Sequence, residues 1–269
     1  MNPKKIFIFG DYSQAEARVV AWKGPVPKLK QWFTSGEDVH LNVAREMGRL
    51  IHDKKLHLPG ELFLRKHPDL YTKEDDERDI SKRTVHANNY GQGAEKFALI
   101  TGLPGHFASL LQTLYHSRFP EIRANYQRSI REDIDRTKTL TTPFGGKIVF
   151  YDIISEDLYR EGYAWYPQNI VGYLTTRWLV KVQRHFKQYK EFSVWTPSNL
   201  RSAGYDVRLQ VHDSIGIVVP DDRESMAYTI KILRQYGEQV VIINNEPLVI
   251  PVDFKVGYSW GEVKDYKGD

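Results

Sequence analysis

Two aspartates, Asp11 and Asp213, stand at the ends of apolar segments, where a charged side chain is unusual. Asp11 directly follows the apolar run 6–10, and Asp213 separates the alternating segment 207–211 from the apolar run 215–219. Asp is common in surface turns, and a surface turn is the simpler interpretation of Asp213 alone. The matching position of Asp11 indicates instead that the two carboxylates act as a pair.

Such a pair requires cations. Two carboxylates about 4 Å apart repel by about 4 kcal/mol at an effective dielectric near 20. Both groups remain ionised at that separation only if positive charge lies between them. Hard cations with oxygen ligands, Mg²⁺ above all, meet this requirement. If the two strands belong to one sheet, Asp11 and Asp213 are therefore a candidate magnesium site.

A second set of polar residues recurs every four positions along one predicted helix: Arg78, Lys82, His86 and Tyr90. At 3.6 residues per turn each step of four advances about 40°, so the four side chains form one stripe. Adjacent cations on a helix repel slightly, whereas a polyphosphate would turn this repulsion into charge-assisted hydrogen bonds. A solvated basic face is the alternative. Gly91 follows the phenol and allows close approach of backbone or ligand.

Three further candidates each have a purely structural interpretation. Glu16 completes a Ser-x-x-Glu capping box with Ser13, which satisfies backbone amides at a helix start. His40 opens a helix, where a lone histidine is usually a surface or packing residue. Gln168 lies in a first helical turn, where most glutamines are solvated.

The elements that must position these residues follow from hydrophobic periodicity. Apolar residues predict strands over 6–10, 207–211, 215–219 and 248–252, and a hairpin with its turn at Gly145–Gly146. The rest of the chain reads mainly as helices, including a long one that begins at Pro167 and Gln168. Asp221 and Glu224 are expected to cap a later helix. Residues 51–77 give no clear pattern.

Composition narrows the class. The chain has 269 residues, a net charge of +4 and no cysteine. The lack of cysteine excludes disulfides, thiolate zinc sites and cysteine nucleophiles, and it suits a reducing cytoplasm. No run reaches transmembrane length and no signal peptide is apparent, so we expect a cytoplasmic protein with no membrane partner. The basic charge permits a polyanionic partner without proving one.

Three segments, taken together, resemble the DNA polymerase I family (family A). Residues 11–18 resemble motif A, the stripe from Arg78 to Gly91 resembles motif B, and residues 210–213 resemble motif C, in the order the family has them. Gly36-x-Asp38-Val39-His40, Gln168 and Gly257-x2-Trp260 also resemble family positions. Arg78-Asp79, together with the segment 90–96, is similar to the phage replicative branch, and the resemblance implies the cytoplasm of a bacterium or a phage-infected host. The resemblance covers nearly the whole chain.

The resemblance implies an α+β right-hand polymerase fold, with an antiparallel palm sheet, flanking helices and a helical fingers domain. The palm would comprise residues 1–22 and 161–269, and the fingers residues 23–160. The implied activity is template-directed DNA synthesis, in which a primer 3′-hydroxyl attacks a dNTP by a two-metal mechanism. Two Mg²⁺ ions would be held by Asp11, Asp213 and the carbonyl of Tyr12.

The resemblance also implies roles for individual residues. Arg78, Lys82 and His40 would neutralise the triphosphate, with Lys82 contributing to catalysis. Tyr90 would stack near the templating position, and Glu16 would exclude ribonucleotides. The dNTP-binding set is Tyr12, Gln14, Glu16, His40, Arg78, Lys82, His86 and Tyr90. The residues expected to contact primer-template DNA are Gln168, His212, Gly91 and Lys147.

This sequence departs from the family pattern in three ways. Ser214 stands where the family usually has Glu, and His86 stands where it has Phe or Tyr. The sequence also starts at the motif A strand, so the thumb, the upstream palm strands and any exonuclease are expected to be absent from this chain. We therefore expect a second polypeptide that supplies the thumb and upstream palm, with or without a 3′–5′ exonuclease. The alternatives are a non-catalytic nucleic-acid-binding remnant and another Mg²⁺-dependent phosphoryl-transfer enzyme.

Overall fold

The computed structural model describes residues 5–53, 73–188 and 205–266. The chain divides into two compact units. We call residues 1–15 and 168–269 the sheet unit, and residues 16–167 the helical unit. Within the described residues, no helix is both long and apolar enough to cross a bilayer.

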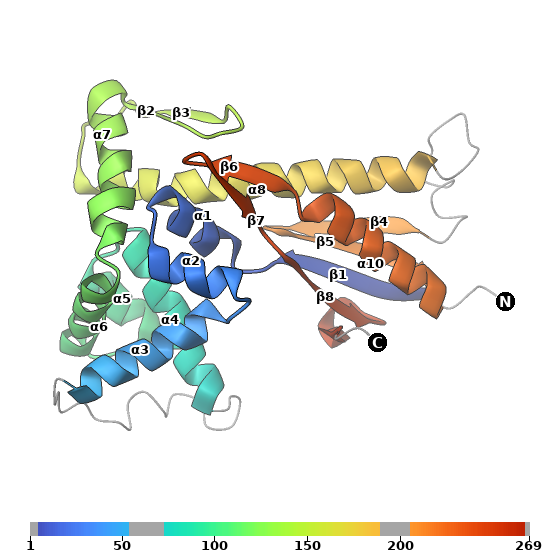
Figure 1. Ribbon diagram of the computed structural model, residues 1–269, viewed down its shortest axis with the longest axis horizontal. Coiled ribbons are helices and arrows are strands. Elements are labelled where there is room, and N and C mark those ends of the chain that lie inside the picture. Colours follow the sequence, from blue (N-terminus) through green and yellow to red (C-terminus); the bar gives the residue numbers. More distant parts are fainter. Residues whose placement is uncertain (1–4, 54–72, 189–204, 267–269) are drawn as a thin grey trace. The chain divides into compact units, whose positions relative to one another are not determined.

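The sheet unit is built on a five-stranded antiparallel sheet with strand order β4-β5-β1-β8-β9 (Figure 1). Its strands are β4 (Asp206–Val211), β5 (Ser214–Pro220), β1 (Lys5–Tyr12), β8 (Val252–Gly257) and β9 (Lys264–Asp265). The α10 helix (Arg223–Gly237) packs across β1, β5 and β8. The remaining elements of this unit are the hairpin of β6 (Val240–Ile243) and β7 (Glu246–Val249), the 3-10 turn η2 (Trp260–Glu262) and the second part of α8 (Glu156–Gln188).

Side chains of β1 alternate between two faces of the sheet. Ile6, Ile8, Gly10 and Tyr12 share one face, because side chains of a strand alternate. Trp178 of α8 is fully buried there, and a Cβ atom added at Gly10 would lie 2.9 Å from its ring. Glycine is thus required at this contact. Asp11 lies on the opposite face, half-buried.

The helical unit contains most of the helices. They are α1 (Ala15–Lys23), α2 (Pro27–Thr34), α3 (Val39–Asp53), α4 (Lys73–Asn89), α5 (Ala94–Thr101), α6 (Gly105–Arg118), the π-helical segment η1 (Ile122–Gln127), α7 (Arg128–Thr137) and the start of α8. The unit also contains a hairpin of two strands, β2 (Thr139–Thr141) and β3 (Lys147–Val149). The predicted hairpin around Gly145–Gly146 is confirmed. Of residues 51–77, positions 54–72 lie outside the described residues.

The prediction that a helix begins at Pro167 is wrong, because α8 begins at Glu156 and Pro167 lies inside it. A proline within a helix cannot donate to the carbonyl four residues earlier. That carbonyl belongs to Tyr163, and it accepts instead from the Tyr126 hydroxyl of η1 at 2.5 Å. A side chain distant in sequence thus satisfies the acceptor that proline leaves free, and the helix continues.

Three smaller predictions also differ from the structure. The strand expected over 248–252 is divided between β7 and β8, because Ile250 and Pro251 separate them. The cap of α10 is Asp222, which accepts from the Ser225 amide at 2.7 Å, rather than Asp221. The helix start that the capping box of Ser13 and Glu16 predicts is shifted: Gln14 has φ 52, and α1 starts after it, at Ala15.

The bond between Tyr126 and Tyr163 makes a quantitative prediction. Tyr126→Phe should lower the free energy of unfolding by about 1–3 kcal/mol, because a buried carbonyl loses its hydroxyl donor. In a Pro167→Ala background the cost should become smaller, because the alanine amide can donate to the same carbonyl. Denaturant unfolding of the two single variants and the double variant measures this coupling.

Tyr115→Phe is the control for that cycle. The Tyr115 hydroxyl is also buried, but it donates to Asn89 Oδ1 at 2.9 Å and does not contact the proline turn. Its cost should be the same whether proline or alanine stands at position 167. Equal costs of Tyr126→Phe in both backgrounds would show that the hydroxyl does not compensate for the proline.

Candidate active site

The sheet brings the two predicted acids together. Asp11 ends β1, and its register partner on the neighbouring strand β5 is Ser214, which directly follows Asp213. The turn between β4 and β5 consists of His212 and Asp213, with His212 in the left-handed region at φ 49. The Tyr12 amide donates to the carbonyl of Asp213 at 3.2 Å. Both predicted acids therefore lie at one end of the sheet.

The electrostatics of Asp11 show how close the two acids are. The pKa of Asp11 is raised to about 7, first by burial, then by the charge of Asp213 and by a hydrogen bond between the two carboxyl groups. Asp253 raises this pKa further, and Lys255 lowers it. A cation between two such carboxyl groups would relieve their repulsion in place of the proton.

Sequence reasoning missed Asp253. It is the register partner of Asp11 on β8, so the two side chains lie on the same face of adjacent strands. Like charges directly opposite each other in an antiparallel pair are unfavourable. The alternation of residues 252–257 gives no sign of this pairing, because a sequence does not show which strand occupies the second edge of β1.

The acids suit a divalent cation without forming a complete cage for one. In the part of the chain that the structure describes, no three His, Asp or Glu side chains form a group that could hold a metal ion. Mg²⁺ typically binds through one or two carboxylates and completes its octahedron with water and substrate phosphates. The pair of Asp11 and Asp213, whose ionised forms repel, provides that number of ligands.

The other predicted site residues of the sheet unit differ in how far their side chains are exposed. The Tyr12 side chain is buried, and its hydroxyl donates to the carbonyl of Gly237 at 2.8 Å, so only its backbone could serve a ligand. The side-chain oxygen of Gln14 is buried without a partner among the described residues. His212 and Gln168 are exposed and free to contact a partner. Ser214 is buried, and its hydroxyl donates to the Val211 carbonyl at 2.5 Å.

In the helical unit, α4 carries Arg78, Lys82 and His86 of the predicted stripe, and Tyr90 directly follows the helix. Three of the four have a partner, and that of His86 is Glu16, with Nδ1 3.8 Å from Oε2. Arg78 Nε lies 2.6 Å from Asp38 Oδ2. The Tyr90 hydroxyl donates to the Glu16 carboxylate, and burial followed by Glu16 raises the pKa of that phenol. Lys82 has no ion pair with any described residue. It is therefore the member of the stripe that is free to meet an incoming anion.

The two histidines of this site are uncharged at neutral pH. Burial, followed by the charge of Lys82, lowers the pKa of His86 to about 4. Burial and then His86 lower the pKa of His40 to about 3, and His40 Nδ1 is buried without a partner among the described residues. The two rings lie 6.0 Å apart. His40 was expected to neutralise a phosphate, but it would carry a positive charge only if a bound phosphate raised its pKa. Without a phosphate, the neutral ring of His40 offers a hydrogen bond.

Two predicted DNA contacts also lie in the helical unit. Gly91 adopts φ 67, and its carbonyl accepts from Arg160 Nε at 2.9 Å. A Cβ atom at Gly91 would lie 3.0 Å from the ring of Tyr163, so a glycine fits this turn. Lys147 is exposed on β3. No side-chain hydrogen bond or ion pair ties Lys147 to a described residue, and nothing in its surroundings marks it as a binding residue.

The pKa of Asp11 predicts how stability depends on pH. Between the ordinary value of 3.8 and the raised value of about 7, the folded protein holds a proton that the unfolded chain has released. The free energy of unfolding of the metal-free protein should therefore fall as pH rises through this window. Asp11→Asn should remove this component, and denaturant unfolding at several pH values in chelator measures the difference. Asp152→Asn, at an exposed position, is the control, and parallel curves for wild type and Asp11→Asn would contradict the assignment.

Comparisons with known proteins point to one family. A solved structure, the POL domain of Pol1 from M. smegmatis in complex with DNA primer-template and dNTP, superposes with a TM-score of 0.71 at 20% sequence identity. The superposition covers 97% of this chain and 41% of that one. At this identity the likeness shows the fold, and the prediction of an α+β polymerase palm with helical fingers is confirmed.

Sequence relatives agree. The thermostable DNA polymerase I of Thermus filiformis is 26% identical over 265 residues, and DNA polymerase I of Helicobacter pylori strain J99 is 25% identical over 261 residues. These matches cover 96% and 94% of this chain, but the chain spans only 27% and 24% of the relatives' length. The sequence model described as DNA polymerase family A matches residues 1–262 of the 269. The chain therefore belongs to DNA polymerase family A.

Proposed function

We propose that this chain carries out template-directed DNA synthesis, in which a primer 3′-hydroxyl attacks the α-phosphate of a dNTP and pyrophosphate leaves. The observation that carries the proposal is the pair of acids on adjacent strands, Asp11 and Asp213, whose mutual repulsion raises the pKa of Asp11. Membership of DNA polymerase family A supports it. In this proposal the sheet unit serves as palm and the helical unit as fingers.

The same acids are proposed to hold two Mg²⁺ ions, with the Tyr12 carbonyl as a further ligand. When bound, these cations would lower the pKa of the primer hydroxyl and neutralise the leaving pyrophosphate. The protein's own contribution is to hold the two carboxylates in place. The sheet hydrogen bonds of β1 with β5 fix the backbone of both acids, so the carboxylates need no rearrangement when the cations arrive.

The α4 stripe is proposed to bind the triphosphate of the dNTP. Lys82 would contribute positive charge directly. Arg78 would first exchange its bond with Asp38 for a bond with a phosphate. Asp38 also accepts from the Leu41 amide of α3, so this exchange would couple nucleotide binding to a rearrangement at the start of α3. His40 and His86, which are neutral, would offer hydrogen bonds.

Tyr90 and Glu16 are proposed to act as a unit beside the sugar of the dNTP. The hydrogen bond from the phenol fixes the rotamer of the Glu16 side chain, so that the carboxylate can exclude a 2′-hydroxyl. Without this bond a glutamate side chain would be free to move aside. Selection against ribonucleotides would therefore depend on both residues.

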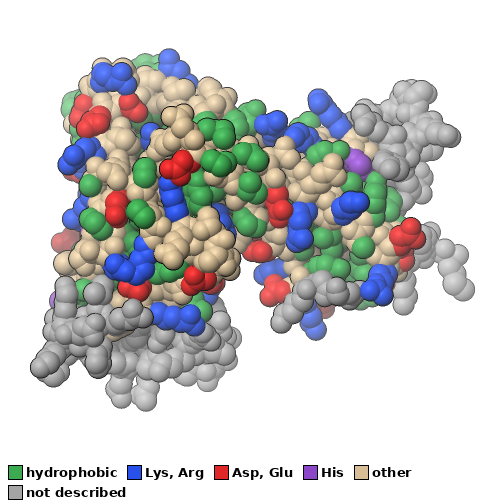
Figure 2. All heavy atoms as spheres, viewed as in Figure 1, with side chains coloured by type: hydrophobic (Ala, Val, Ile, Leu, Met, Phe, Trp, Pro, Cys, Tyr) green, Lys and Arg blue, Asp and Glu red, His purple; other side chains and the backbone are tan. Residues whose placement is uncertain are grey.

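Primer-template DNA is proposed as the macromolecular partner, contacted through Gln168, His212, Gly91 and Lys147. The surface charge does not form a single basic band on the face shown in Figure 2, where Lys and Arg side chains are scattered among Asp and Glu. The division into palm (1–22 and 161–269) and fingers (23–160), and a second polypeptide with thumb and upstream palm, remain predictions.

A non-catalytic DNA-binding role is the second candidate. The buried Ser214 hydroxyl, which donates to a backbone carbonyl, leaves motif C with one carboxylate. The position of Asp11 and Asp213 together at one end of the sheet favours the catalytic proposal. A different magnesium-dependent phosphoryl-transfer enzyme is the third candidate, and it would require no primer-template.

The catalytic proposal predicts a requirement for both acids. Asp11→Asn and Asp213→Asn should each lower single-turnover incorporation of a dNTP by about a hundredfold or more, because one cation ligand is lost. Rapid-quench primer extension measures this rate. Asp152→Asn is the matched control, since its side chain is exposed and removed from the site. A wild-type chain that binds primer-template but never extends it would favour the non-catalytic role, and a chain that does not bind it would favour the third candidate.

The pairing of Glu16 with Tyr90 predicts a specific change in substrate selection. Glu16→Ala should raise the ratio of ribonucleotide to deoxyribonucleotide incorporation, because room appears beside the sugar. Tyr90→Phe should produce a smaller change in the same direction, because the carboxylate loses the bond that holds it. Glu95→Ala removes the corresponding acid of α5 and should leave the ratio unchanged. If the ratio does not respond to Glu16→Ala, the bond serves folding alone.

A further inference from the structure

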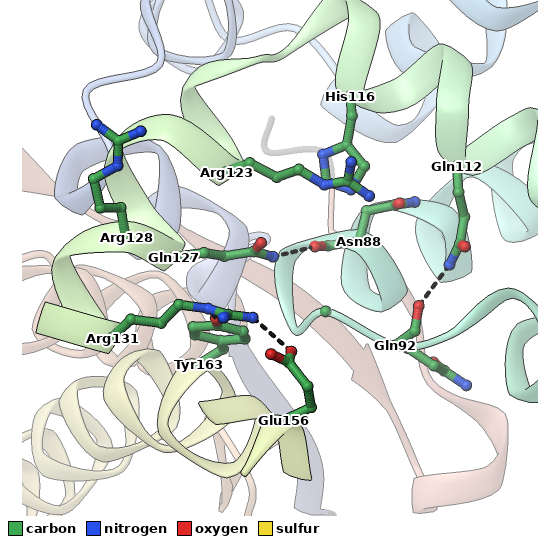
Figure 3. A pocket seen from close by; sticks show the side chains of 11 residues that line it. Asn88, Gln92, Gln112, His116, Arg123, Gln127, Arg128, Arg131, Glu156 and Tyr163 are labelled. Atoms are coloured by element: carbon green, nitrogen blue, oxygen red, sulfur yellow. Dashed lines mark hydrogen bonds and ion pairs between the residues drawn. The ribbon is translucent and has the colours of Figure 1, made fainter. Parts of the chain in front are cut away.

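One polar cavity of the helical unit belongs to the DNA-binding surface proposed above. Its volume is about 400 Å³, and it is lined by Gly91, a proposed DNA contact, and by side chains of α4, α6, η1, α7 and α8 (Figure 3). The sheet unit carries a different feature, which none of the proposed roles uses. This feature is a row of basic and apolar side chains on the outer side of α8.

Four exposed residues lie on one side of α8, and we call them the outer row: Tyr173, Arg177, Val180 and Arg184. Their spacing is four, three and four residues, so at about 100° per residue they fall within about 60° of the helix circumference. In Figure 2, Lys and Arg side chains gather over this part of α8. The spacing is that of residues through which one helix packs along another.

The opposite side of the same helix is fixed to the sheet. Leu174 and Trp178 are buried, and Trp178 packs against β1 at Gly10. Asp11 lies on the other face of that strand, because side chains of a strand alternate. Gln168, the proposed DNA contact of α8, lies about 150° round the helix from the outer row. Helix and sheet therefore separate the outer row from the two acids, and DNA held at the acids would leave the row uncovered.

The positive charge of the outer row is not neutralised by the part of the chain that the structure describes. Arg177 and Arg184 have no ion pair with a described residue, and Lys181 beside them donates to Gln239 Oε1 at 2.6 Å. Residues 162–188 contain no Asp or Glu. Burial, and then the charge of Arg177, lower the pKa of Lys181. An acidic partner would therefore be attracted to this side of α8.

The apolar members of the outer row distinguish between kinds of partner. Tyr173 is 43% exposed and Val180 is 37% exposed. A phosphate backbone would leave Val180 in water, whereas an apolar side chain of a protein would remove it from water. A second copy of this chain would bring like charges together, because its own row is basic. The row rises about 16 Å along the helix axis, a length that one short helix covers.

We propose that the outer row of α8 binds an acidic amphipathic helix of a second protein. Leu or Ile side chains of that helix would cover Tyr173 and Val180, and its Asp or Glu side chains would pair with Arg177 and Arg184. The contact would have the size of a transient interface, because it involves one face of a single helix. The inference does not rest on the proposed function, since binding at the outer row requires neither metal ions nor nucleotide.

The test uses a defined peptide and the full chain. The acidic probe is a fluorescein-labelled peptide of three heptads, with Leu at the first and fourth positions of each heptad and Glu or Ala elsewhere. The neutral probe has Gln in place of each Glu. Fluorescence anisotropy should show that wild type binds the acidic probe about tenfold more tightly than the neutral probe. Circular dichroism should show that the acidic probe gains helicity when it binds.

Two variants test the two kinds of contact. Arg177→Glu/Arg184→Glu should weaken binding of the acidic probe by about tenfold, because two ion pairs are lost. Val180→Ser should weaken it by about threefold, because less apolar surface is covered. Both arginine side chains are exposed, so the fold should be retained, and thermal unfolding of each variant checks this.

A matched control reverses the same number of charges elsewhere. Lys231→Glu/Lys264→Glu changes two exposed lysines of α10 and β9 in the same unit and should leave binding of the acidic probe unchanged at physiological salt, where distant charges are screened. A third probe, with Lys in place of each Glu, exchanges the signs. It should bind Arg177→Glu/Arg184→Glu more tightly than it binds wild type, because complementarity is restored.

Three outcomes would overturn the proposal. One is equal affinity of the wild-type chain for the acidic and neutral probes. Another is binding of a blunt DNA duplex that Arg177→Glu/Arg184→Glu weakens as much as it weakens binding of the acidic probe, which would assign the arginines to DNA. The third is a dimer of the wild-type chain in sedimentation that the same substitutions dissociate, which would assign the outer row to a second copy.

Discussion

Antiparallel pairing of β1 with β5 on one side and β8 on the other is the constraint on which the candidate site depends. This pairing holds the Asp11 carboxylate beside that of Asp213 and opposite that of Asp253, although their charges repel. The sheet can impose the arrangement because the opposite face of β1 is buried against Trp178, with glycine at position 10 to admit the ring. Core packing thus offsets an electrostatic conflict that a cation would relieve.

The helical unit manages its charges differently. Its buried histidines are kept neutral by desolvation, Arg78 is held by Asp38, and Glu16 is held by the Tyr90 hydroxyl. Of the two stripe residues that are charged, Lys82 has no ion pair with the described part of the chain, whereas Arg78 is paired with Asp38. In the proposed function, a phosphate would attract Lys82 and compete with Asp38 for Arg78.

Much of this arrangement could be predicted from the sequence. Alternating and continuous apolar runs placed both acids at the ends of strands, and the four-residue spacing placed Arg78, Lys82 and His86 on one helix, which Tyr90 directly follows. These predictions succeeded because they depend on local periodicity. The start of α8 could not be predicted in the same way, because Pro167 is tolerated only through the hydroxyl of Tyr126, a contact between residues far apart in sequence.

The features that sequence reasoning missed also depend on contacts between residues far apart in sequence. Asp253 became visible only when β8 was seen to pair with β1, and the division of residues 246–257 into two strands depends on Pro251. The π-helical segment η1 is a further case. The spacing of four between the buried Ile122, Tyr126, Ile130 and Ile134 is ordinary for an α-helix and does not reveal a π segment.

The central claim is that the sheet forces Asp11 and Asp213 together in a site that a divalent cation completes. The most direct measurement is an NMR titration of the aspartate carboxyl carbons, with Asp11 assigned by comparison with Asp11→Asn, in the absence and presence of Mg²⁺. The account predicts that Asp11 titrates near pH 7 without metal, and that Mg²⁺ moves this titration to lower pH. A titration near the ordinary value of 3.8 in the metal-free protein, unaffected by Mg²⁺, would contradict it.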